Sequence, residues 1–123
     1  MVERVIQVAP GHHQVFCPEP GVTLELIHSG TGFQVFLVEV QPNTRSQPAA
    51  HDGEEVRYVL EGNVVFRVAD REYYVPAGGS LRHPSSVAHG FHTSGEVARF
   101  VTFALSRDYD IRTLFRGTAE GES

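Results

Sequence analysis

The sequence has little cysteine, no cluster of basic residues and no long apolar run. Its single cysteine, Cys17, excludes an internal disulfide and favours a reducing compartment. The formal net charge is −5 at pH 7 and Arg is scattered along the chain, which argues against nucleic-acid binding. The apolar run Phe33–Val40 is interrupted by Gln34 and Glu39 and is far too short to cross a membrane.

The beginning and the composition of the chain favour a soluble protein. Met1–Pro10 lacks a basic region followed by a long apolar stretch, so no signal peptide is expected and we predict a cytoplasmic location. The 123 residues are 41% hydrophobic and 20% charged, which suits one compact globular domain. No repeat or linker interrupts the sequence, so a single domain is expected over residues 1–123.

Short β-prone stretches alternate with turn residues, which include 12 Gly and 7 Pro. This spacing is typical of a β-sandwich or barrel. The predicted strands are Val22–His28, Phe33–Gln41, Glu55–Leu60, Val64–Ala69, Arg71–Val75, Ser80–His83, His89–Thr93 and Val97–Leu105. Helical patterns are scarce. The best is Tyr109–Phe115, which predicts a short helix in a C-terminal tail, packed on the barrel or on a second subunit.

Candidate metal ligands stand at distinctive spacings in two segments. The first segment runs from His51 to Gly62 and resembles the first cupin motif, a His-x-His pair followed by three or four residues, a Glu, six residues and a Gly. His51 matches the second His, Glu55 matches the Glu and Gly62 matches the Gly. The closing run Tyr58–Gly62 is a common form of that motif's end.

The second segment, residues 78–93, resembles the second cupin motif in the same register. Gly78, Pro84 and His89 match it, while Ser86 replaces its Gly and Thr93 replaces its Asn. The similarity extends over residues 33–105, between an N-terminal strand segment at 1–32 and a tail at 106–123. It implies an all-β fold, the cupin-type double-stranded β-helix or jelly-roll barrel. The strands also resemble the cupin domains appended to helix-turn-helix regulators.

The chain departs from the family at Ala49, which stands where the first motif His is expected. The resemblance therefore implies a metal site of two His and one Glu: His51, Glu55 and His89. In this ligand set it is similar to the cupin epoxidases that make phosphonate antibiotics and hold iron with two His and one Glu. Such a set is also the facial triad of non-haem Fe(II) oxygenases. Fe(II) is favoured, with Mn, Ni or Zn as alternatives.

Four further residues are candidates for the pocket. His83 precedes the motif Pro and is expected either to fill the gap at Ala49, to act as a general acid or base, or to be a hydrogen-bonded barrel residue. Arg57 shares the face of Glu55 and needs an anionic partner, either Glu39 or a bound carboxylate or phosphate. The other two candidates are Gln47, which could reach inward in place of the missing ligand, and Phe91, which should face inward with His89.

These residues predict a metal-dependent enzyme acting on a small organic substrate, possibly an anionic one. Its chemistry would be of the oxygenase type with iron, or isomerase or lyase chemistry with another metal. The alternatives are a binding or sensing module and a barrel that has lost its metal with the His at position 49. The expected partners are a small molecule and a second subunit, without nucleic acid or membrane. The start of the chain, Val2–Val8, is a candidate edge strand for the homodimer.

Overall fold

The computed structural model describes residues 4–106 and contains nine strands there. They are β1 (Gln14–Glu19), β2 (Val22–Gly30), β3 (Phe33–Val40), β4 (Glu54–Glu61), β5 (Asn63–Val68), β6 (Arg71–Pro76), β7 (Ser80–Pro84), β8 (His89–His92) and β9 (Ala98–Leu105). The predicted strands correspond to β2–β9, with ends that differ by one or two residues. The predicted helix Tyr109–Phe115 lies outside the described residues.

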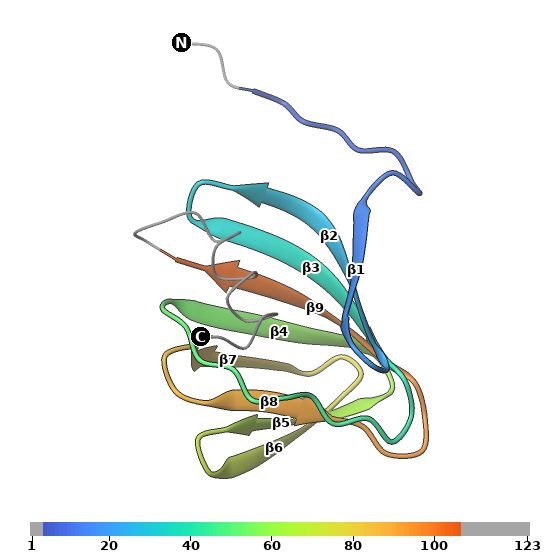
Figure 1. Cartoon of the computed structure of the whole chain (residues 1–123), viewed down its shortest axis with the longest axis vertical. Helices are drawn as coiled ribbons and strands as arrows, with labels where there is room; N and C mark the ends of the chain where they lie inside the picture. The colour runs from blue at the N-terminus through green and yellow to red at the C-terminus, as the bar shows by residue number, and fades with distance from the viewer. Residues whose placement is uncertain (1–3, 107–123) are drawn as a thin grey trace.

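The strands form two antiparallel sheets (Figure 1). The larger sheet has the order β1-β2-β3-β9-β4-β7, and the smaller has the order β6-β5-β8. Neighbours far apart in sequence, such as β3 and β9 or β4 and β7, are not joined by hairpins, because the chain between them passes through the smaller sheet. This jelly-roll arrangement confirms the predicted all-β fold class, and the described part of the chain contains no helix that could cross a membrane.

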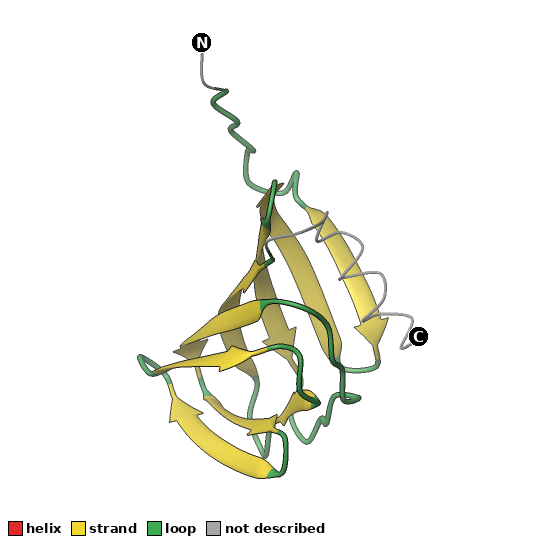
Figure 2. Ribbon diagram, turned by 90° about the vertical axis from the view of Figure 1, so that its left-hand side faces the viewer, coloured by secondary structure: helices red, strands yellow, loops and turns green. Residues whose placement is uncertain are grey.

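Alternation along the strands places the core between the two sheets (Figure 2). On β3, for example, Gln34, Phe36, Val38 and Val40 are buried, whereas the residues between them are half-buried on the outer face. The buried apolar cluster combines residues of both sheets: Val22, Phe36, Val38, Val40, Val59, Val64, Phe66, Val75, Ala98 and Phe100. Its aromatic rings meet edge to face, with Phe66 and Phe100 centroids 5.2 Å apart.

The edge of the larger sheet differs from the expectation. The described part of Val2–Val8, residues 4–8, belongs to no strand, and Val5 is 93% exposed. A turn at Pro10-Gly11 separates this segment from the sheet, and Gly11 has a φ of 81° that favours glycine. The edge strand is instead β1, which pairs with β2. Residues 4–8 therefore form no edge strand within the single chain, and the role of Val2–Val8 in a homodimer stays a prediction.

Candidate metal centre

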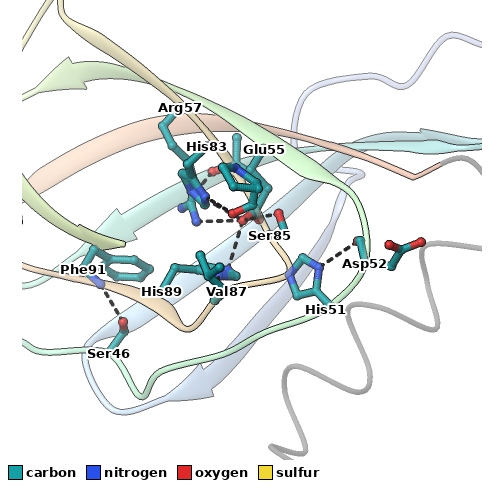
Figure 3. Close-up of polar contacts among 12 residues, drawn as sticks. Ser46, His51, Asp52, Glu55, Arg57, His83, Ser85, Val87, His89 and Phe91 are labelled. Atoms are coloured by element: carbon teal, nitrogen blue, oxygen red, sulfur yellow. Dashed lines mark hydrogen bonds and ion pairs between the residues drawn. The ribbon is translucent and has the colours of Figure 1, made fainter. Parts of the chain in front are cut away.

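The three predicted ligands converge inside the barrel (Figure 3). Glu55 comes from β4 and His89 from the start of β8, while His51 lies in the loop that leads into β4. One potential ligand atom of each lies within 4.8 Å of the others. Gly53 makes this possible because it has a φ of 105° and its α-carbon packs against the Leu105 carbonyl, where a Cβ would not fit.

Backbone carbonyls fix the tautomers of both imidazoles. The Nδ1 atom of His51 lies 3.2 Å from the Asp52 carbonyl oxygen, and that of His89 lies 2.8 Å from the Val87 carbonyl oxygen. A carbonyl can only accept, so each Nδ1 carries the proton and donates it. Each Nε2 then presents a lone pair to the interior, which is the arrangement that second-shell carbonyls impose on metal-binding histidines.

The Nε2 lone pair of His89 faces the carboxylate of Glu55. The Nε2 atom of His89 lies only 3.1 Å from Glu55 Oε1 in a site where His89 is 5% exposed and Glu55 is 8% exposed. Two acceptor atoms at this distance repel unless a proton or a cation lies beside them. Two imidazole nitrogens and one carboxylate are suitable ligands for a divalent transition metal, so the donor set and its tautomers fit such an ion.

Glu55 is held as a charged carboxylate. Its Oε1 accepts hydrogen bonds from Arg57 Nη2 at 3.0 Å and from Ser85 Oγ at 3.1 Å. Burial acts to raise the pKa of Glu55, but the positive charge of Arg57 outweighs burial and holds that pKa well below its ordinary value. In contrast, burial lowers the pKa of His51, which keeps its imidazole neutral and able to bind a metal.

Arg57 is 5% exposed and its charge is compensated inside the protein. Besides Glu55, its guanidinium donates to Thr102 Oγ1 at 3.4 Å and stacks over Phe66 and Phe100, with distances of 5.3 and 5.7 Å to the ring centroids. The suggestion that Glu39 is its partner is wrong, because Glu39 lies on the outer face of β3. The buried partner is the candidate ligand Glu55.

His83 contacts the site from behind Glu55. It is 5% exposed, its Nδ1 bonds the Pro84 carbonyl oxygen at 2.8 Å, and its Nε2 lies 3.7 Å from Glu55 Oε1. Burial and then the charge of Arg57 lower the pKa of His83. Its ring lies 5.0 Å from that of His89, yet His83 lines a separate surface depression beside Gly53. His83 is not part of the group of potential ligand atoms that His51, Glu55 and His89 form, and its role stays a prediction.

A cavity of about 310 Å³ opens onto the three ligands. Ala49 lies in its wall and is joined to His89 by a pair of backbone hydrogen bonds of 2.9 Å. Phe91 lines the cavity as predicted, while Gln47 lies at its exposed rim. The apolar wall comes from both sheets: Val22, Leu24, Phe36, Val38, Phe91 and Ala104. The small residue at position 49 leaves this side of the cavity open to a ligand.

Ser85 and Gln34 are among the buried polar residues of the site that were not predicted. Ser85 is fully buried and bonds Glu55, and its backbone carbonyl accepts from the His51 amide at 2.8 Å. Gln34 is 2% exposed and lines the cavity. The signal for Gln34 is its place in the alternation, since it shares the inner face with Phe36 and Val38. No comparable signal exists for Ser85, which lies in a loop.

Comparison with known proteins agrees with this fold. The cupin domain family matches residues 36–104. This chain belongs to the cupin family. The match confirms the resemblance of the two motifs and lies within the predicted span of residues 33–105. The two motifs together supply the candidate ligands: the first motif carries His51 and Glu55, and the second carries His89.

Related cupins include a regulator and enzymes. The HTH-type transcriptional regulator PuuR of Escherichia coli (strain K12) is 30% identical over 87 residues, which cover 67% of this chain and 47% of the regulator. The chain thus spans about half the length of the curated relatives that it matches. The polyketide cyclase RemF from Streptomyces resistomycificus has a TM-score of 0.70 and 26% identity, over 83% of this chain and 80% of the cyclase.

A further structural neighbour is the hydroxypropylphosphonic acid epoxidase from S. wedmorenis. It has a TM-score of 0.72 and 18% identity, and the alignment covers 82% of this chain and 59% of the epoxidase. At this identity the likeness shows the fold alone. The cupin fold in these neighbours thus carries both enzymatic and regulatory proteins.

Proposed function

We propose that this chain is a metal-dependent enzyme that acts on a small, mostly apolar organic molecule. The observation that carries this proposal is the convergence of His51, Glu55 and His89 on a cavity of about 310 Å³. A cavity of this size accepts a small organic ligand. Three protein ligands leave coordination positions free for a substrate, which a site closed by four protein ligands would not.

The metal that we propose is a divalent ion, with Fe(II) favoured. Two imidazoles and one carboxylate form the facial triad of Fe(II) oxygenases. A solved structure of the epoxidase is described as the Fe(II) form, with a TM-score of 0.73 to this chain. When bound, such an ion supplies either dioxygen chemistry, if it is iron, or Lewis-acid chemistry, if it is Mn, Ni or Zn. The oxygenase type is favoured, with isomerase or lyase chemistry as the alternative.

The charges of the site favour an uncharged substrate. Arg57 is paired with Glu55, so an anionic substrate would compete with a candidate metal ligand for the guanidinium. We infer that Arg57 holds Glu55 in place instead of binding a substrate carboxylate. His83 is proposed to support Glu55 from the opposite side, and its free Nε2 is the atom through which it would exchange a proton.

A second candidate is a binding or sensing module without catalysis. The match to PuuR favours it, because the alignment with that regulator covers two thirds of this chain. Both candidates require the cavity, but only the enzyme converts what binds there. The protein would be incubated with Fe(II), dioxygen and an extract of small metabolites, and the mixture analysed by mass spectrometry. Consumption of one compound with formation of a product supports the enzyme, whereas retention of an unchanged compound supports the sensor.

The metal is tested separately. Protein purified without a chelating tag would be titrated with Fe(II) and Zn(II) alongside His51→Ala, Glu55→Gln and the control His12→Ala. His12 is exposed and is not among the residues that line the cavity. The two site variants should lose most of the metal affinity while the control keeps it. Equal affinity in all four proteins would disprove the assigned ligands.

A further inference from the structure

Gln34 is a buried carboxamide without a partner. It is 2% exposed, lies on the inner face of β3 and lines the cavity. Within residues 4–106 its side chain makes no hydrogen bond, yet its polar atoms are not among those sealed inside the protein. They are therefore open to the cavity. A buried amide that lacks a hydrogen bond is costly, so this position is expected to serve a ligand.

The register of the sheet relates Gln34 to the metal centre. Gln34 pairs with Ala104 on β9, and Ala104 pairs with Glu55 on β4, so the three form one row across the sheet. Two strand spacings separate Gln34 from Glu55, or about 10 Å between their backbones. The residue between them is an alanine, whose small side chain leaves the intervening space to the cavity. A ligand bound at the metal centre can therefore extend over Ala104 toward Gln34.

Other polar side chains of the cavity make hydrogen bonds within the protein, although the Nε of Arg57 has no partner among the described residues. Arg57 donates to Glu55 and Thr102, and Ser46 Oγ accepts the amide of Phe91 at 2.9 Å. Around Gln34 the wall is apolar, with Phe36 and Val38 following it on the same face of β3. The carboxamide thus provides a neutral donor group, the NH2, and a neutral acceptor, the carbonyl oxygen, in an apolar setting.

We propose that Gln34 recognises the substrate by a hydrogen bond to a neutral polar group, a carbonyl or a hydroxyl. The substrate class is an apolar molecule with a metal-binding group at one end and this neutral group at the other. An ionised group at the second end is disfavoured, because Gln34 supplies no compensating charge for a buried anion or cation. This assignment rests on the proposed function only for the position of the metal-binding end.

The test uses two probes of the same shape. Both 4-acetylcatechol and 4-ethylcatechol carry a metal-chelating diol, and only the first has a carbonyl across the ring from it. Binding would be measured by calorimetry with the Zn(II)-loaded protein and with the metal-free protein. Wild type should prefer the acetyl probe about three- to tenfold, the range for one net hydrogen bond. The variant Gln34→Met, which has a similar size, should lose this preference through weaker binding of the acetyl probe.

Two controls keep the outcome clear. Gln14→Leu removes an exposed carboxamide at the start of β1 and should keep the wild-type preference. Gln34→Glu keeps a polar side chain but removes the donor to the carbonyl, so it should also lose the preference. The proposal is overturned if the ratio of the affinities for the acetyl probe and the ethyl probe is the same in wild type and in both Gln34 variants. Failure of Zn(II) to bind refutes the proposed metal centre and not the role of Gln34. If the metal-free protein still prefers the acetyl probe and loses that preference on substitution of Gln34, the proposed role of Gln34 is upheld. Loss of Zn(II) on Gln34→Met would make Gln34 a metal ligand and also overturn the proposal.

Discussion

Removal of Arg57 should destabilise the metal-free protein far more than the metal-bound protein. Arg57 and Glu55 form a buried ion pair at 3.0 Å, with side chains that are 6% and 10% exposed. The variant Arg57→Met keeps the aliphatic bulk of the side chain but leaves the Glu55 carboxylate without its strongest partner. Breaking a buried pair from one side costs about 3 kcal/mol or more.

A bound divalent ion changes this balance because it compensates Glu55 directly. The loss of stability from Arg57→Met should therefore shrink by at least about 1.4 kcal/mol when Zn(II) is saturating, which corresponds to a tenfold tighter binding of Zn(II) by the variant. Urea denaturation of wild type and variant, each with and without Zn(II), measures both quantities. The control is Arg82→Met, since the pair of Arg82 and Glu54 at 2.8 Å is exposed and should contribute less than about 0.5 kcal/mol. An equal loss with and without Zn(II) would refute the reasoning.

Three further predictions concern the same site. Ala49→His should restore the fourth metal ligand, because Ala49 lies in the cavity wall beside His89. The variant should bind Zn(II) about tenfold more tightly or better in a competition titration, and it should exclude small organic ligands from the cavity. Unchanged Zn(II) affinity would mean that position 49 does not face the ion. Ser85→Ala removes the 3.1 Å hydrogen bond to Glu55 and should lower Zn(II) affinity about tenfold, without loss of the fold in circular dichroism. Burial lowers the pKa of His51 below the ordinary histidine value of 6.5. The absorption of Co(II) bound at the site should therefore stay constant as the pH falls to 6.5 and decrease only below that pH. A decrease that is complete above pH 6.5 would contradict the lowered pKa of His51.

Most of the fold could be predicted from the sequence, since strands β2–β9 follow β-prone stretches bounded by turn residues. The missed strand, β1, contains Pro18 and has exposed residues at its start, so its apolar content is too low to distinguish it from a loop. The segment Val2–Val8 has the stronger β pattern, but its described residues are separated from the sheet by the turn at Pro10-Gly11. Strand propensity alone does not select which segment pairs with the sheet.

The ligands were predicted from two motifs, whereas their surroundings were not. The spacing of His51, Glu55 and His89 can be seen in the sequence. The positions of the carbonyls that orient the two imidazoles depend on the conformation of the loops, which the sequence does not show. The partner of Arg57 was not predicted because Glu55 was considered only as a metal ligand. Gln34 interrupts an apolar run in the sequence, and only the fold shows that it lies on the core face of β3.

The most direct test of the metal centre is a crystal structure of the protein grown with Co(II) or Zn(II), with diffraction recorded at the absorption edge of the ion. A single strong anomalous peak is predicted at bonding distance, about 2.0–2.2 Å, from Nε2 of His51, Nε2 of His89 and a carboxylate oxygen of Glu55. The side of the ion that faces Ala49 should carry water or a small ligand. A peak bound to other residues, or no peak in this cavity at saturating metal, would contradict the proposed site.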